Sequence, residues 1–291
     1  GIPQQVTVNT ATTKQRISEE HIDYLDQEFS RQMIRQLDQL TGYALIHGAG
    51  DTQMASQILI DTNFNLVIVE EDPKIAAKTR SFFNEKGLYG KRIVVHKKSG
   101  NQLPYPDFMF NFICVDINAL KGAKPQLSEY YRLLRPFGTF TIGGKKGASE
   151  ALALAHKPLV ELVASSPDFK SKFHSMKDQQ WHVINRGRLP GSGEWSHQYA
   201  DPGNTACSED MRISGDLRLQ WYGKPGPYRM FDRHSYTTAP VYSSGRLFTL
   251  GERILYANDA YNGRVLWEKE LPSLEPRVNL PRDCGYMVTD R

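Results

Sequence analysis

The stretch Tyr43–Gln53, YALIHGAGDTQ, decides the fold of the first half of this chain. Its apolar run Tyr43–His47 predicts a short buried strand, and Gly48, Ala49 and Gly50 follow this run directly. Glycine lets a backbone pass close to a ligand because it carries no Cβ atom. The run and the glycine turn together therefore predict a strand and a ligand loop at the edge of an α/β sheet.

Strands and helices alternate on both sides of this stretch. A helical pattern covers Ser18–Leu40, with Gly42 as its predicted stop, and further helices are predicted over residues 51–60, 73–87 and 126–138. Strands are predicted over residues 65–72, 92–97, 110–116 and 139–144. This alternation predicts right-handed crossovers and a mostly parallel sheet, which binds ligands beyond the carboxyl ends of its strands.

A carboxylate, Glu70, stands at the end of the second predicted strand. A carboxylate at this place can accept both hydroxyls of an adenosine ribose. A glycine turn after a strand also occurs simply to fit a tight connection to a helix, so both interpretations stand. A dinucleotide fingerprint is not matched, because Gln53 occupies the position of its third glycine, and no P-loop is present.

Four segments, in this order, resemble class I S-adenosylmethionine-dependent methyltransferases. They are LIHGAGD (45–51), VIVEEDP (67–73), LPYPDFMFNFICVD (103–116) and LLRPFGTFTIGG (133–144). The resemblance covers roughly residues 20–187 and implies a Rossmann-like domain that binds S-adenosylmethionine. It also implies a terminal antiparallel hairpin, which residues 172–187 would supply.

The resemblance implies a set of cofactor contacts in the loops after the strands. The implied cofactor-binding residues are Gly48, Ala49, Gly50, Glu70, Ser99 and Asp116. Among them Gly48 and Gly50 match the loop glycines, and Glu70 matches the acid that binds the ribose. Asp116 could face the transfer site, although an ordinary turn residue at a strand end is the interpretation that we favour.

Three positions depart from the family pattern. Ile46 stands where the family has an acid, Thr52 replaces its third glycine, and Ser99 replaces the acid that meets the adenine amino group. The loss of carboxylates removes favourable electrostatics toward a sulfonium cation, so we expect weak binding of the cofactor. No catalytic residue can be assigned, since His47, His96 and His182 are isolated and are predicted to be packed or surface histidines.

The composition changes from about Leu189. Residues 189–205 are rich in Gly, Pro, Ser and Asn and are predicted to form a linker and loops. Short strands are then predicted over residues 217–223, 239–245, 246–251, 253–260 and 265–271. This spacing is typical of a sandwich, a barrel or a propeller blade. The loop 222–235, with Arg229 and His234, is predicted to be solvated, with a binding site as the alternative.

The segment Leu255–Glu268, LYANDAYNGRVLWE, resembles the repeat of quinoprotein-type (PQQ-repeat) β-propellers. The matching positions are Ala257, Asp259, Ala260, Gly263 and Trp267. Asp259 and Asn262 are predicted to bind turn amides, Gly263 to take a positive φ, and Trp267 to dock between neighbouring blades. The resemblance covers roughly residues 192–291. It does not imply bound pyrroloquinoline quinone, which we do not expect here.

The predicted fold class is α/β plus all-β: a Rossmann-like methyltransferase domain followed by β-propeller blades. The expected organisation is an N-terminal extension (1–17), a methyltransferase-like domain (18–187), and a linker with the first blades of an incomplete propeller (188–291). Such a propeller would need further sequence or a partner protein chain. The domain order resembles that of large proteins from planctomycete-type bacteria.

Charge and cysteine content limit the partners and the compartment. A formal net charge of +4 gives no indication of nucleic-acid binding, and no apolar stretch is long enough to span a membrane. The expected location is exported or periplasmic if Gly1 is a processed N-terminus, and cytoplasmic otherwise. Cys114 is predicted to lie in the core. A disulfide between Cys207 and Cys284 would require an oxidising compartment.

Three functions remain open from the sequence. The first is an S-adenosylmethionine-dependent methyltransferase whose acceptor is chosen by the propeller. The second is a non-catalytic scaffold or protein-interaction module that uses a degenerate methyltransferase fold. The third is a quinone-dependent oxidoreductase, which has the least support because the predicted blade region shows no metal-ligand cluster and no paired catalytic carboxylates.

Overall fold

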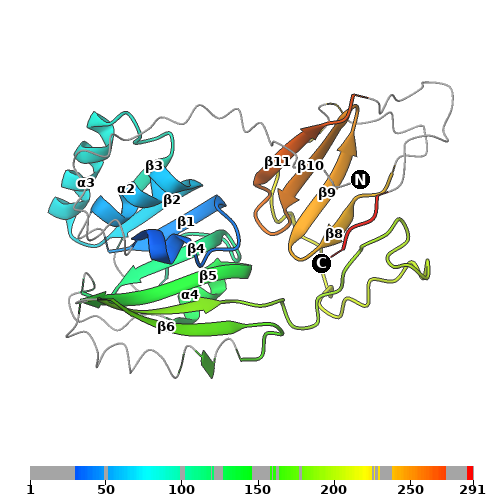
Figure 1. The fold of residues 1–291 in the computed structure, drawn as a ribbon, viewed down its shortest axis with the longest axis horizontal. Coiled ribbons are helices and arrows are strands. Elements are labelled where there is room, and N and C mark those ends of the chain that lie inside the picture. Colours follow the sequence, from blue (N-terminus) through cyan, green and yellow to red (C-terminus); the bar gives the residue numbers. More distant parts are fainter. Residues whose placement is uncertain are drawn as a thin grey trace. The chain divides into compact units, whose positions relative to one another are not determined.

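The computed structural model describes residues 30–48, 52–98, 102–118, 120, 127–145, 158, 160–161, 164–176, 179–224, 226, 229, 238–272 and 287–290. The chain divides into two compact units, the first within residues 15–190 and the second containing residues 191–291. Each unit has its own sheet (Figure 1). In the described residues, no helix has the length and apolar character needed to cross a bilayer.

The first unit is built on a mixed sheet. Its described strands are β1 (Thr41–His47), β2 (Asn63–Glu70), β3 (Ile93–Lys97), β4 (Phe110–Asp116), β5 (Leu134–Lys145), β6 (Lys170–Met176) and β7 (Gln179–Asn185). They lie in the order β3-β2-β1-β4-β5-β7-β6. Strands β1 to β5 are parallel, whereas β7 runs antiparallel to both β5 and β6. The predicted Rossmann-like sheet, with its terminal antiparallel hairpin, is therefore confirmed for this unit.

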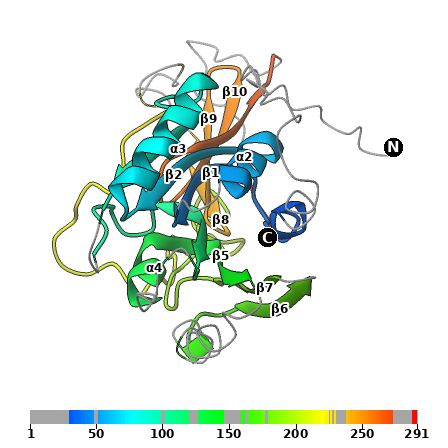
Figure 2. The same cartoon turned by 90° about the vertical axis from the view of Figure 1, so that its left-hand side faces the viewer.

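Helices cover both faces of this sheet. Helices α2 (Thr52–Asp61) and α3 (Pro73–Glu85) lie on one face, and α4 (Leu127–Leu133) lies on the other (Figure 2). Local sequence sets the ends of α3: Asp72 caps its start by accepting a hydrogen bond from the Lys74 amide at 2.8 Å, and Gly87 takes a φ of 66° just beyond its end.

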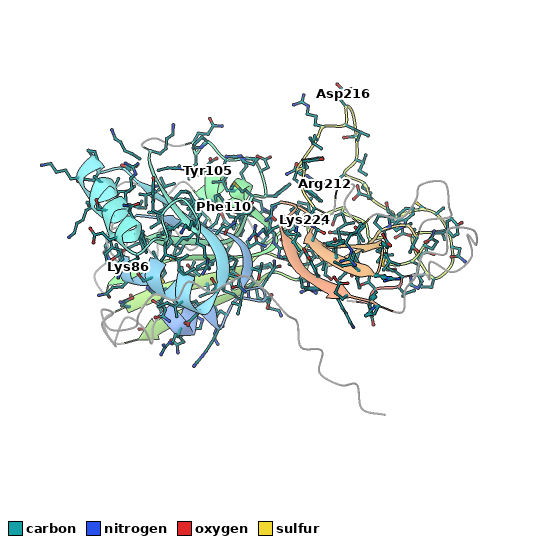
Figure 3. The ribbon with its side chains drawn as sticks, turned by 90° about the horizontal axis from the view of Figure 1, so that it is seen from above. Lys86, Tyr105, Phe110, Arg212, Asp216 and Lys224 are labelled. Atoms are coloured by element: carbon teal, nitrogen blue, oxygen red, sulfur yellow. The ribbon has the colours of Figure 1, made fainter. Side chains whose placement is uncertain are left out.

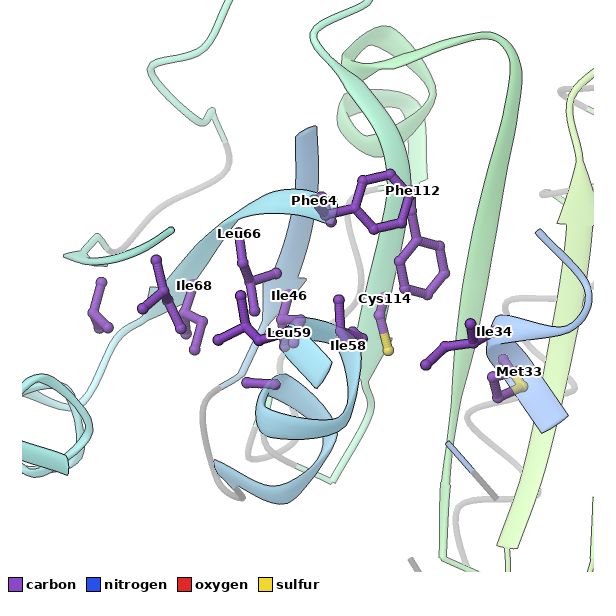
Figure 4. Close-up of a cluster of buried hydrophobic side chains, with 14 of the residues drawn as sticks. Met33, Ile34, Ile46, Ile58, Leu59, Phe64, Leu66, Ile68, Phe112 and Cys114 are labelled. Carbon is purple, nitrogen blue, oxygen red and sulfur yellow. The ribbon is translucent and has the colours of Figure 1, made fainter. Parts of the chain in front are cut away.

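Side-chain alternation along each strand divides the apolar residues between the two faces. On β1, Ile46 packs toward α2 and α3, while its neighbour Leu45 packs toward α4. The α2/α3 face holds Phe64, Phe112 and the predicted core residue Cys114 (Figure 4). Because β1 and β4 are buried on both faces, they read in the sequence as continuous apolar runs.

Two element boundaries differ from the sequence prediction. The N-terminal helix is described over residues 30–34 only, and the predicted stop Gly42 is instead part of β1. Gly42 takes a φ of 136°, and a Cβ atom there would overlap the side chain of Asn111, whose Oδ1 accepts the Tyr43 amide at 3.0 Å. The helix predicted over 126–138 ends at Leu133, because the chain enters β5 directly at Leu134 and pairs with β4.

The second unit contains an antiparallel sheet of four described strands. These are β8 (Val241–Ser243), β9 (Arg246–Gly251), β10 (Ile254–Asp259) and β11 (Val265–Glu270), in the order β11-β10-β9-β8. Each strand pairs with the one that follows it in the chain, so the sheet is a simple meander. Four of the five strands predicted after residue 210 are present.

The prediction of a strand over residues 217–223 is wrong. These residues join no sheet, and Leu217 and Leu219 are 85% and 82% exposed. They belong to a projecting loop that has Asp216 at its tip and Arg212 and Lys224 nearer its base (Figure 3). The first strands of a further blade were expected in residues 277–291, of which only 287–290 are described, and these four residues form no strand.

Candidate functional site

The carboxyl edge of the first sheet brings three predicted residues onto neighbouring strands. His47, the last residue of β1, pairs with Val69 on β2 and with Val115 on β4. Along this edge Gly48 therefore lies between Glu70 at the end of β2 and Asp116 at the end of β4. The strand order reverses between β1 and β4, and open α/β sheets bind ligands at such a reversal. Ala49, Gly50 and Ser99 lie outside the described residues.

Gly48 begins the loop with a backbone shape that favours glycine. Its φ is 96°, and its amide donates a 2.9 Å hydrogen bond to the carbonyl of Val69 on β2. This bond holds the start of the loop against the end of β2, next to Glu70. Side chains other than hydrogen are strained at this φ, so the residue type follows from the backbone geometry.

Glu70 is a buried carboxylate, with a side chain only 3% exposed. Its Oε1 accepts a 2.9 Å hydrogen bond from the Asp72 amide, and its own carbonyl accepts the amide of Lys98 after β3. A carboxylate has two oxygens with about four acceptor sites in all. A pair of ribose hydroxyls is a donor group of the kind that such a carboxylate accepts.

Asp116 is engaged in a turn. Its Oδ1 accepts a 2.8 Å hydrogen bond from the amide of Asn118, and the next amide, that of Ile117, donates to Gly143 on β5. This geometry is that of an ordinary turn residue at a strand end, which is the interpretation favoured by the sequence. Asp116 lies at the carboxyl edge, where such sheets bind ligands, but its described hydrogen bond stabilises a turn.

Ile46 shows how the departures from the family pattern are accommodated. It is 4% exposed and belongs to the apolar cluster under α2 and α3. The place of the missing acid is thus filled by core packing. Thr52, at the place of the third glycine, is the first residue of α2. The edge therefore retains a glycine loop and one acid but has an apolar residue in place of the other.

A histidine–tyrosine pair that the sequence does not reveal lies at the same edge. Nδ1 of His47 is 2.6 Å from the hydroxyl of Tyr130 on α4, and the two rings meet edge to face. Burial lowers the pKa of His47, while the carboxylates of Glu71 and Glu70 act in the opposite direction. Burial also raises the pKa of Tyr130. The prediction that His47 is a packed histidine is confirmed, but its partner stands 83 residues away in the chain.

The other two histidines named above are also paired with hydroxyl groups. His96 near the end of β3 lies 2.7 Å from the hydroxyl of Tyr105, whose ring in turn meets that of Phe110 edge to face (Figure 3). Burial raises the pKa of Tyr105 to about 12. His182 lies 2.6 Å from the hydroxyl of Ser171, within the terminal hairpin of β6 and β7.

An ion-pair network fixes the segment that leads into β4. Arg132 on α4 contacts Glu129 at 2.7 Å and Asp107 at 2.6 Å, and it donates to the carbonyls of Tyr105 and Leu103. Glu129 in turn accepts the amide of Leu103. The network holds residues 103–107 against α4 through both charge and backbone hydrogen bonds.

The turn between β10 and β11 confirms several predictions for the second unit. Oδ1 of Asp259 accepts the amides of Tyr261 and Asn262, at 3.0 and 3.3 Å, and Oδ1 of Asn262 accepts that of Arg264. Gly263 takes a φ of 72°, as expected. These bonds satisfy the turn locally and give it a defined shape.

Trp221, rather than Trp267, packs on this turn. A Cβ atom at Gly263 would overlap the indole ring of Trp221, and Nε1 of Trp221 donates a 2.9 Å hydrogen bond to the carbonyl of Ala260. Trp267 lies on β11, where its ring is 5.9 Å from that of Phe248 on β9. Docking of Trp267 against a neighbouring blade stays a prediction.

Two other residues predicted for the second unit have defined positions. Arg229 is tied to the sheet through two bonds to the carboxylate of Glu270 and further bonds to the carbonyl of Glu252. Cys207 is exposed with a free thiol, while Cys284 lies outside the described residues. Among the residues that the structure describes, no three His, Cys, Asp or Glu side chains group so as to hold a metal ion.

No family model matches this sequence, and no curated protein does. Similar solved structures include an S-adenosylmethionine-dependent methyltransferase from Aquifex aeolicus, with 16% identity over 54% of this chain and 88% of that chain, and a TM-score of 0.43. Another is geranyl diphosphate C-methyltransferase from Streptomyces coelicolor, with 9% identity over 57% of this chain and 80% of that chain, and a TM-score of 0.44. Similarity at these identities concerns the fold alone.

Proposed function

We propose that the first unit binds S-adenosylmethionine at the carboxyl edge of β1 and β2, as a methyltransferase-like domain. The observation that carries this proposal is the register of that edge. Gly48 is hydrogen-bonded to the residue before Glu70. A glycine whose backbone a ligand can approach closely therefore lies next to a buried carboxylate. This is the combination that an adenosine ribose requires: backbone access and an acceptor for two hydroxyls.

Binding is expected to be weak. The apolar Ile46 is buried at the position where the family that this chain resembles has an acid. One carboxylate that would attract a sulfonium cation is therefore absent. The loss of one hydrogen bond to a charged group costs about 1.5–3 kcal/mol, which is roughly a tenfold or larger loss in affinity. We therefore expect no saturation at low micromolar S-adenosylmethionine.

Calorimetry on the full chain tests this proposal. Titration with S-adenosylmethionine should show weak but saturable binding, and Glu70→Gln should reduce it by about tenfold or more, because an amide accepts fewer hydrogen bonds and has no charge. Glu71→Gln is the matched control, since Glu71 is exposed one residue further along. Equal affinities of the two variants would exclude Glu70 as a ribose contact.

A non-catalytic scaffold is the second candidate function. It is favoured by the same buried Ile46 and by the structural bond that Asp116 makes at the place where it could face a transfer site. The second candidate predicts that the domain retains its fold but transfers no methyl group to any acceptor. Incubation with radiolabelled S-adenosylmethionine and an extract of acceptors would separate the two, since any protein-dependent transfer excludes this candidate.

We further propose that the second unit is one blade of a quinoprotein-like propeller. The four-stranded meander, the Gly263 turn and the tryptophan seated on it support this interpretation. In a propeller, such a blade packs against others around an axis. A quinone-dependent oxidation is not supported by any described group in this unit.

A further inference from the structure

A buried nitrogen atom at the carboxyl edge has no hydrogen-bond partner among the described residues. His47 is 8% exposed, and its Nδ1 is engaged with the hydroxyl of Tyr130 at 2.6 Å. Within the part of the chain that the structure describes, its other ring nitrogen, Nε2, is buried without a partner. A buried polar atom left in this way costs about 1–3 kcal/mol, so its presence in a folded protein requires an explanation.

The position of His47 suggests the explanation. It is the last residue of β1, next in register to Val69 on β2 and to Val115 on β4, and Gly48 follows it. Its ring therefore lies at the reversal of strand order, where sheets of this kind bind their ligands. It points to the α4 side, opposite to the side on which Ile46 packs, because neighbouring side chains on a strand alternate.

Tyr130 is suited to hold the imidazole ring in place. It is almost fully buried on α4 and packs at 5.6 Å against Phe140 of β5. A hydroxyl held in this way fixes the rotation of the histidine ring, so that Nε2 has one direction only. Burial lowers the pKa of His47, which keeps the ring neutral near pH 7 and avoids repulsion of a cationic ligand.

We propose that His47 is a ligand-contact residue, whose Nε2 hydrogen-bonds the adenosyl ligand bound at this edge, with Tyr130 as its positioning residue. The proposal rests on the binding of S-adenosylmethionine proposed above. It adds a side-chain contact on the α4 side of the site. It also gives a function to a residue that the sequence shows only as an isolated histidine.

The test uses a double variant of the full chain, His47→Leu with Tyr130→Phe. This change removes both polar partners together, so it leaves no new unpaired group and should not lower the thermal midpoint. Affinity for S-adenosylmethionine should nevertheless fall by about three- to tenfold, the value of one neutral hydrogen bond. A merely structural pair would leave the affinity for S-adenosylmethionine unchanged.

The matched control is His182→Leu with Ser171→Ala, which removes a second histidine–hydroxyl pair, with His182 buried and Ser171 exposed, from the terminal hairpin. This control should bind S-adenosylmethionine as the natural chain does. Unchanged affinity in the His47 variant overturns the contact but leaves the proposed function intact. Absence of binding in the natural chain overturns both.

A measurement on the natural chain makes the test independent of any variant. In nitrogen-15 spectra of the imidazole rings, the Nε2 resonance of His47 should move on addition of S-adenosylmethionine, while the resonances of His182 should not. A His47 resonance that stays in place in the saturated protein also overturns the proposal, even if the double variant does not fold.

Discussion

Replacement of Gly263 by alanine tests whether the tryptophan on the β10–β11 turn is an energetic element of the blade. Alanine at a φ of 72° is strained by about 1–2 kcal/mol. Its methyl group would also overlap the ring of Trp221, so the indole must leave the turn and its bond to the Ala260 carbonyl. A lost hydrogen bond adds about 0.5–1.5 kcal/mol. The total, with lost ring contacts, is about 2–4 kcal/mol.

The free energy of unfolding of the full chain is measured by urea titration, with tryptophan fluorescence as the signal. Gly215→Ala is the matched control, because Gly215 has the same φ of 72° but a Cβ atom there would meet nothing within 4 Å. It should cost the backbone strain alone. In a Trp221→Ala background, Gly263→Ala should likewise cost only about 1–2 kcal/mol. If Gly263→Ala costs the same with and without Trp221, the docking has no energetic weight and the reasoning fails.

Three further predictions concern the first unit and the cysteines. Arg132→Met should destabilise the first unit by about 2–4 kcal/mol in urea, because it leaves the carboxylate of Glu129 buried without its cation; Glu129→Gln should recover part of this loss. Alkylation of the native chain, read by peptide mass spectrometry, should label Cys207 and spare Cys114, whose pKa burial raises to about 12. Burial lowers the pKa of His47 below its ordinary 6.5, so the unfolded chain binds the extra proton more readily than the folded chain does. The free energy of unfolding should therefore fall as the pH drops below about 6.5. The His47→Leu variant should show a smaller fall in the same titration.

The alternation of strands and helices in the first unit was readable because it depends on local periodicity. Apolar runs predicted β1, β2 and β4, and Pro73 and Gly87 marked the two ends of the helix predicted at α3. The turn at Gly263 was equally readable, since Asp259 and Asn262 bond to amides only two or three residues away. Each of these features depends on neighbours in the chain, so the residue pattern records it directly.

Local patterns misled where distant contacts decide the outcome. Leu217 and Leu219 alternate with polar residues as a strand would, yet no neighbouring strand pairs with them in the structure. Gly42 resembles a helix stop, but its positive φ allows close approach of Asn111. The contact of Trp221 with the Gly263 turn was not predicted, because 42 residues separate the two along the chain.

The sequence by itself determined the kinds of element, the glycine loop with its acid Glu70, and the two-part organisation expected for the chain. Only the tertiary structure decided the strand order and the pairing of His47 with Tyr130 across 83 residues. The physical reason is that periodicity and turn chemistry act over a few residues and leave a regular trace in the sequence. A hydrogen bond between two distant side chains leaves no such trace, since any chain path that brings the two together satisfies it equally well.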